Sequence, residues 1–269
     1  MNKNLSLFLI GIIISISSFA QKPKKIFSFL EEGKLQEAME EYNLISSEKK
    51  YDNEDKILFE ISNCLLMIAP NSSKYNPIQS IKNFNNLVII DKEKEGVITF
   101  LKKYELDSLK ISERIHSEIV IQAKKINSIE SYSNALIFCS ISSKDELQKL
   151  LERQILDKAK FNNSISELNN YIQSYSNYKI EATNYRDSIV LSIVPKEYNA
   201  LLKFTKEFPT SKFNTEIKLK LPDLLLKESL EINTLESLKK FITEFPNDSR
   251  INIVNHYCPI KIEINRFTS

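Results

Sequence analysis

The feature that most constrains this chain is a short sequence motif that occurs twice, as LLKFTKEFPTS at residues 201–211 and as LKKFITEFPND at residues 238–248. We call this motif the phrase. Each copy has two aromatic residues four positions apart, followed directly by proline. Residues four apart share one face of an α-helix, and the residue before a proline disfavours helical backbone. The phrase therefore predicts the end of a helix whose aromatic side chains pack against a neighbouring helix. A stacking platform for sugars or bases is the alternative use of these aromatics.

Related phrases extend the pattern toward the N-terminus. Residues 163–177 match residues 233–247 at four identical positions, with Tyr171 and Tyr175 in place of the two phenylalanines. Similar segments carry Phe100 with Tyr104, and Ala135 with Cys139. The first position of the phrase thus falls at residues 100, 135, 171, 204 and 241, at intervals of 35, 36, 33 and 37 residues. A period of this length is typical of helix–turn–helix repeats, in which neighbouring pairs bury each other's apolar faces.

Helix boundaries are marked in several places. Ser164 is a suitable N-cap, and with Glu167 it makes a capping-box sequence. Ser143 and Glu146 repeat that spacing and predict a second capping box. Pro222 interrupts an otherwise helical apolar pattern, so we expect it to kink or split its helix.

Composition agrees with an all-α chain. Only 3 of the 269 residues are glycine, fewer than the turns of a β-rich fold or a phosphate-binding loop need. Hydrophobic residues make up 42% and charged residues 27%, which favours a folded core over disorder. The net charge of +2 gives no basic excess for binding nucleic acid. We therefore expect an α-solenoid of stacked helical hairpins that does not bind nucleic acid.

Two segments carry a resemblance to known repeat families. In residues 29–45, Gly33, Ala38 and Tyr42 fall where the turn and second helix of a tetratricopeptide repeat place glycine, alanine and an aromatic residue. The later phrases look like the repeats of bacterial envelope proteins such as the outer-membrane-assembly lipoprotein and the Tol–Pal periplasmic coordinator. The resemblance spans roughly residues 23–257 and implies stacked tetratricopeptide-like repeats that bind other proteins.

Residues 1–20 have the pattern of a secretory signal peptide. Lys3 precedes an apolar run at residues 5–16, which is short for a membrane span, and small residues lead to Ala20. The junction after Ala20 resembles those of secreted proteins from Bacteroidetes bacteria, so we expect cleavage there and export to the periplasm or cell envelope. An uncleaved anchor is the alternative, and the lack of a nearby cysteine argues against a lipoprotein.

The rest of the chain divides into three parts after this signal peptide. We expect N-terminal tetratricopeptide-like hairpins at residues 21–90, helical repeats with the aromatic phrases at 91–257, and a tail at 258–269. Alternating isoleucines in that tail predict a short strand.

The sequence offers little for catalysis. Cys64 and Cys139 stand in apolar helical contexts that predict buried thiols, and Cys258 completes an odd count without any C-x-x-C pair. His116 and His256 lack the spacing of a metal site. We therefore expect no catalytic residue, metal or cofactor. A pair of carboxylates facing each other across a cleft is the alternative that would make the protein an enzyme.

The polar faces of the phrase helices suggest where a partner would bind. One repeat carries Asn169, Asn170 and Gln173 there, and the next two repeats carry lysines, so the stripe becomes basic toward the C-terminus. A rim of lysines would steer an acidic partner, whereas a merely solvated face is the alternative. The predicted partner-binding residues are Lys203, Lys206, Lys239 and Lys240.

The predicted function is therefore that of a non-catalytic, exported scaffold that binds another protein or peptide of the bacterial envelope. The alternative function is an accessory or regulatory subunit of an envelope enzyme complex that processes cell wall or glycans.

Overall fold

The computed structural model describes residues 22–46, 53–88 and 95–255, and all regular secondary structure in these ranges is helical. The protein is all-α in this part, as the composition predicted. The chain forms two compact units, Met1–Leu151 and Glu152–Ser269, which we call the N-terminal and C-terminal units. The predicted signal peptide and the predicted strand in the tail lie outside the described residues.

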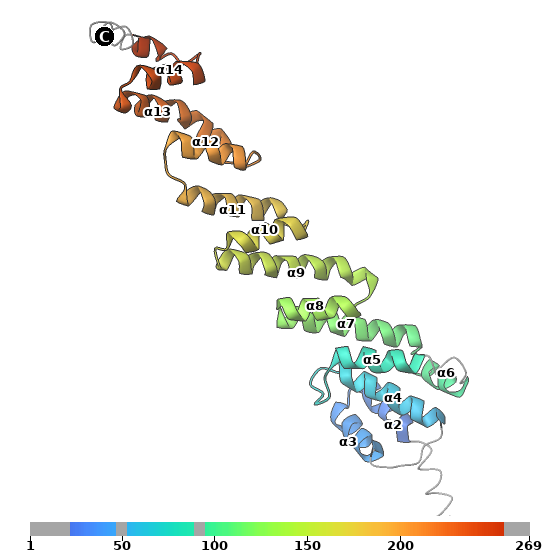
Figure 1. Ribbon diagram of the computed structural model, residues 1–269. Helices are drawn as coiled ribbons and strands as arrows, with labels where there is room; N and C mark the ends of the chain where they lie inside the picture. The colour runs from blue at the N-terminus through green and yellow to red at the C-terminus, as the bar shows by residue number, and fades with distance from the viewer. Residues whose placement is uncertain (1–21, 47–52, 89–94, 256–269) are drawn as a thin grey trace, which may run out of the picture. The chain divides into compact units, whose positions relative to one another are not determined.

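The N-terminal unit is built from paired helices. Helix α2 packs against α3, α4 against α5, and α7 against both α5 and α8 (Figure 1). Gly33 forms the α2–α3 turn with a φ of 71°, and Ala38 is fully buried, as expected for this segment. The helices are α2 (Lys22–Glu31), α3 (Leu35–Ser46), α4 (Asn53–Ile68), α5 (Pro77–Val88), α6 (Glu95–Lys102), α7 (Ser108–Ile126) and α8 (Ile129–Phe138).

Helix α9 (Ile141–Phe161) contains the boundary between the two units. In the C-terminal unit α10 packs against α11, and α13 packs against both α12 and α14. Pro222, expected to kink or split its helix, lies inside α13, which continues on both sides of it; the helix is not split, and a kink stays a prediction. The helices here are α10 (Ile165–Ser174), α11 (Lys179–Ile193), α12 (Tyr198–Glu207), α13 (Asn214–Ile232) and α14 (Leu235–Glu244).

The repeated phrase forms the ends of short helices, as predicted. Helices α10, α12 and α14 stop directly before the second aromatic residue, whose backbone N–H donates to the carbonyl of the first. Phe204 and Phe241 are buried in the core of the C-terminal unit. Phe208 and Phe245 are only half-buried, because each sits at the helix end where the chain turns away. These aromatics serve core packing, as predicted: the first position is buried in the core, and the second is half-buried and packs against it.

Asparagine and a hydroxyl residue join three of the long helices, α7, α9 and α13, to the short helix that follows, whereas Glu197 precedes α12. Asn127, Asn163 and Asn233 take left-handed backbone with φ of 48–52°, which asparagine tolerates better than most residues. The following residue then caps the next helix through its side-chain oxygen, as Thr234 does for the amide of Ser237 at 3.2 Å. This arrangement explains why the repeats open with Asn-Ser or Asn-Thr.

Two predicted caps have different outcomes. Ser164 is the N-cap of α10 and accepts a hydrogen bond from the amide of Glu167, as predicted. The carboxylate of Glu167 accepts from the side chain of Asn162. The capping box expected at Ser143 is wrong, because α9 begins at Ile141 and Ser143 therefore lies inside its first turn.

Candidate binding cavity in the N-terminal unit

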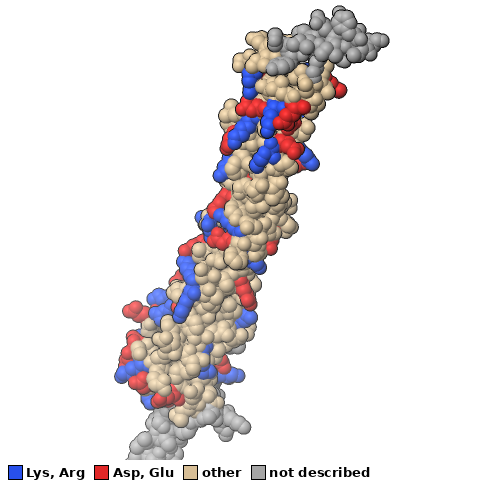
Figure 2. Space-filling model, turned by 90° about the vertical axis from the view of Figure 1, so that its left-hand side faces the viewer, with Lys and Arg blue, Asp and Glu red and all other residues tan. Residues whose placement is uncertain are grey.

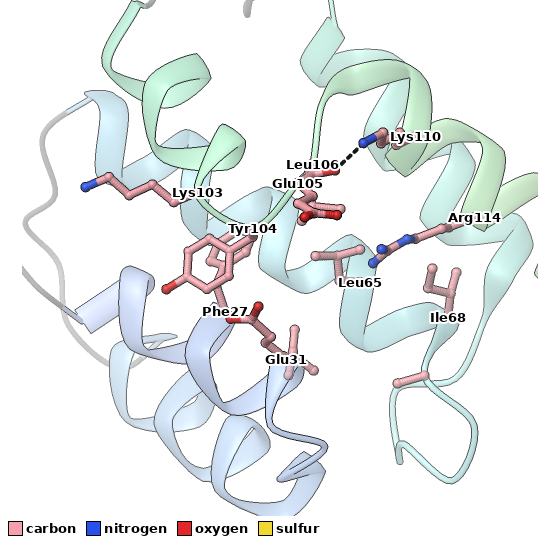
Figure 3. Close-up of a pocket in the computed structure, with 12 residues that line it drawn as sticks. Phe27, Glu31, Leu65, Ile68, Lys103, Tyr104, Glu105, Leu106, Lys110 and Arg114 are labelled. Atoms are coloured by element: carbon pink, nitrogen blue, oxygen red, sulfur yellow. Dashed lines mark hydrogen bonds between the residues drawn. The ribbon is translucent and has the colours of Figure 1, made fainter.

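A cavity of about 750 Å³ lies in the N-terminal unit between α2, α4, the α6–α7 connection and the start of α7 (Figure 3). Its apolar wall includes Phe27 and Leu65, which are buried, and Leu30 and Ile68, which are half-buried. The connection contributes Lys103, Tyr104, Glu105 and Leu106, and α7 contributes Lys110 and Arg114. Apolar and charged side chains therefore meet at one concave site.

The aromatic phrase of α6 supports this cavity. The ring of Phe27 on α2 meets Phe100 edge-on, with centroids 5.3 Å apart, and lies 5.8 Å from Tyr104. Burial, together with the carboxylates of Glu31 and Glu32, raises the pKa of Tyr104. Its hydroxyl is therefore protonated at neutral pH and available as a hydrogen-bond donor at the cavity wall.

Charged groups surround the apolar wall. In Figure 3, Arg114 extends from α7 over Leu65 toward the cavity, while Lys103 reaches away on the opposite side. Lys110 donates a hydrogen bond of 2.9 Å from Nζ to the carbonyl of Glu105, which ties the connection to α7. The lining thus carries three cationic side chains and the carboxylates of Glu31 and Glu105.

The backbone at Glu105 is strained. Its φ is 53°, and it occupies the position after a helix at which glycine is usual. Two bonds close this turn: the amide of Glu105 donates to Lys102, and that of Leu106 donates to Leu101. Left-handed backbone costs about 1–2 kcal/mol for most residues other than glycine. Such strain concentrates at functional sites, so this turn is a candidate element of a binding site.

A comparison within the chain strengthens this point. Among the described residues other than glycine, six have positive φ, and four of them are asparagines at turns. The two exceptions are Glu105 and Tyr178. Glu105 lines the cavity of the N-terminal unit, and Tyr178 lines a separate hollow of the C-terminal unit.

The four predicted lysines lie elsewhere, on exposed faces of α12 and α14 in the C-terminal unit. Lys203 pairs with Glu207 at 3.6 Å, and Lys240 Nζ lies 5.2 Å from the ring centroid of Tyr198. Lys239 and Lys240 border a hollow of about 530 Å³ that also includes two glutamates. Acidic residues are thus interleaved with these lysines, and Figure 2 shows both signs intermixed on the face it presents. Their role in binding a partner stays a prediction.

The cysteines and histidines that the structure describes are not among the residues that line the cavity. Cys64 and Cys139 are buried thiols, as predicted, and burial raises the pKa of Cys64 to about 12. Burial lowers the pKa of His116, which favours its neutral form. His256 and Cys258 lie outside the described residues. Within the described ranges no three metal-ligating side chains cluster, and no helix combines the length and apolarity that a membrane span requires.

Sequence reasoning missed the cavity altogether. Its residues come from α2, α4 and α7, and only the packing of these helices brings them together. The one local signal was the break between the helices of residues 95–102 and 108–126, which places several charged residues in one turn.

No protein-family model, curated protein or solved structure matches this chain. The resemblance to tetratricopeptide-like repeats therefore rests on the residues quoted above.

Proposed function

We propose that this protein is an exported, non-catalytic scaffold of the bacterial envelope that holds another envelope protein in the cavity between α2, α4 and α7. The cavity is the observation that carries this proposal, because it joins an apolar wall to charged groups on a concave surface. A protein segment with an apolar side chain beside an acidic residue would suit it. Its apolar side chain would meet Leu30 and Ile68, and its carboxylate would meet Arg114.

We also propose that the chain is an α-solenoid of tetratricopeptide-like helix pairs. The support is the alternation from α6 to α14, in which five helices of 8–10 residues are separated by four of 15–21 residues. The first phrase position is buried in all five short helices. Repeated pairs of this kind present extended surfaces that suit protein binding.

A photo-crosslinking experiment tests the binding role. The chain from residue 21 onward, with a photo-reactive residue at Leu30 in the apolar wall, is irradiated in envelope extract from its host. Arg114→Ala and Ile68→Gln change the cavity, whereas Lys125→Ala changes an exposed residue of the same helix, α7. We expect one dominant protein adduct that persists in the Lys125 variant and falls at least about tenfold in the cavity variants. An adduct of equal yield in all variants would contradict the proposal.

Export has its own test. Mass spectrometry of the protein from its host should find Gln21 as the first residue in the envelope fraction. An intact Met1 in a cytoplasmic fraction would refute export without bearing on the cavity.

A further inference from the structure

A second hollow, of about 550 Å³, lies in the C-terminal unit where α11 begins. It is lined by Tyr178, Ile180 and Tyr185 from the start and middle of α11, by Lys160 near the end of α9, and by Lys212 in the α12–α13 connection. Two of these side chains expose apolar surface to solvent. Ile180 is 80% exposed and Tyr178 is 39% exposed.

Tyr178 has a backbone conformation that tyrosine disfavours, and hydrogen bonds of the neighbouring residues hold the chain there. It precedes α11 with φ 57° and ψ 15°, and its side chain makes no capping hydrogen bond. The amide of the preceding Asn177 donates to the buried carboxylate of Glu152 at 3.0 Å, and Tyr171 donates its hydroxyl to the Asn177 carbonyl at 2.6 Å. Both backbone polar groups of Asn177 are thereby fixed, which holds the backbone where it enters Tyr178.

Arg153 completes this support. Its guanidinium carbon lies 5.3 Å from the centroid of the Tyr178 ring. The guanidinium is itself fixed by Asp157 at 3.1 Å and by Glu181 at 2.8 Å. Tyrosine and arginine are both enriched among the residues that contribute most to binding at protein interfaces.

The charges of the hollow are unevenly balanced. Glu181 pairs with both Arg153 and Lys160, so its carboxylate is already occupied. Lys212 is exposed, its Nζ lies 5.1 Å from the ring centroid of Phe213, and no ion pair joins it to a carboxylate in the described part of the chain. The rim therefore offers one cation to an incoming acidic group.

We propose that this hollow docks a protein segment that places an apolar side chain against Tyr178 and Ile180 and a carboxylate beside Lys212. The exposed apolar surface of Tyr178 and Ile180 suits an apolar side chain. Lys212, which has no ion-pair partner in the described part of the chain, suits an acidic residue next to it. A single such cation is too little for a nucleic-acid backbone, which needs several phosphate contacts. The site lies in the other unit from the cavity described above and does not depend on it, so the protein would hold its partners at two places.

The experiment uses a random linear peptide library displayed on phage and panned against the whole chain from residue 21 onward. Enriched peptides are synthesised with a fluorophore, and their dissociation constants are measured by anisotropy. Tyr178→Asn installs the residue type that takes left-handed backbone at four of the other described turns, and Ile180→Gln changes a side chain too exposed to affect folding. Lys212→Glu reverses the rim charge. The matched controls are Lys218→Glu, an exposed lysine of α13, and Arg114→Ala in the other unit.

We expect a group of enriched peptides with an acidic residue next to a leucine, phenylalanine or proline. Their affinity should fall at least about tenfold with Ile180→Gln, Tyr178→Asn and Lys212→Glu, and stay unchanged in both controls. The proposal is wrong if no enriched peptide loses affinity in the Ile180 and Lys212 variants. Peptides that respond to Arg114→Ala alone would support the cavity of the N-terminal unit and count against this second site.

Discussion

Helices α8 and α14 occupy the same place in the repeated pattern but fill it in opposite ways. In α14 a leucine, Leu238, precedes the aromatic Phe241 by three residues, and both are fully buried. In α8 the same two positions hold Tyr132 and Ala135, which are also buried. The large and the small side chain have changed places. This difference teaches that the aromatic ring can lie at either position of the pair, and we infer that the two positions share one region of the core.

The short helices also differ in whether their buried aromatic residue is tyrosine or phenylalanine, and the tyrosine hydroxyl accounts for this difference. Tyr132 donates to the side chain of Asn127 at 2.8 Å, and Tyr171 in α10 donates to the carbonyl of Asn177. Buried tyrosines need such partners, whereas Phe204 and Phe241 do not. Aromatic choice at the phrase thus follows from whether a polar group lies within reach.

The largest effect is expected from removing the ring of Phe241. Phe241→Ala leaves a cavity in the core of the C-terminal unit and should cost about 3–5 kcal/mol in the free energy of unfolding, measured by urea denaturation. Phe245→Ala, at the half-buried second position, is the matched control and should cost clearly less. If Phe241→Ala were as stable as wild type but no longer bound the partner, the aromatic residues would be a recognition surface and not part of the core.

The two buried thiols provide a second comparison, this time in their response to pH. Burial raises the pKa of Cys64 to about 12, well above the value of about 8.5 for an exposed cysteine. The folded state thus disfavours the thiolate, so this contribution to stability is complete below pH 8.5 and is lost as the pH rises toward 12. Between pH 8 and pH 10 the loss should be about 2 kcal/mol.

Urea denaturation at both pH values checks this, with Cys64→Ala as the control that should lack the part of the loss that comes from Cys64. Cys139 directly follows α8, as Phe245 directly follows α14, and burial raises the pKa of Cys139 too. Cys139→Ala should therefore remove part of the alkaline loss. If neither variant differed from wild type in its pH dependence, the thiols would be exposed to solvent in solution.

The helix caps allow the two regions to be compared at a smaller scale. Ser128 caps α8 and Thr234 caps α14, each in a reciprocal capping box with a serine three residues later. Ser128→Ala and Thr234→Ala should each cost about 1 kcal/mol in the free energy of unfolding. A clear inequality between the two would mean that the repeats depend on their caps to different extents.

Local signals account for what the sequence could predict. The i, i+4 aromatics followed by proline predicted the ends of α12 and α14, and Ser164 predicted the start of α10. The start of α9 was missed, because its first residue, Ile141, is an apolar side chain that is 88% exposed and satisfies no pattern of burial.

The cavity and the second hollow could not be predicted in the same way. Both join residues from helices far apart in the chain, so no local spacing marks them. Glu105 and Tyr178 also adopt backbone that their residue types disfavour, and any rule based on local preference assigns them another conformation.

The smallest effect on stability is expected from the lysines of α12 and α14. Reversing Lys203, Lys239 and Lys240 to glutamate should leave the urea midpoint nearly unchanged, since these side chains are exposed. The association rate constant for the partner identified by crosslinking is measured by stopped flow at low salt. It should fall in this variant if the lysines steer the partner. Unchanged kinetics would place the encounter surface elsewhere, either in the N-terminal unit or at the hollow beside Lys212.

A double-mutant cycle in α8 tests most directly whether the two positions share one region of the core. Tyr132→Leu and Ala135→Phe together give α8 the leucine and phenylalanine that α12 and α14 carry. Tyr132→Phe measures separately the loss of the hydrogen bond to Asn127. Each single change should destabilise, one by leaving a cavity and the other by overpacking. We predict that the double variant is more stable than the sum of the single effects allows, by about 1–3 kcal/mol. Strictly additive losses would contradict the account.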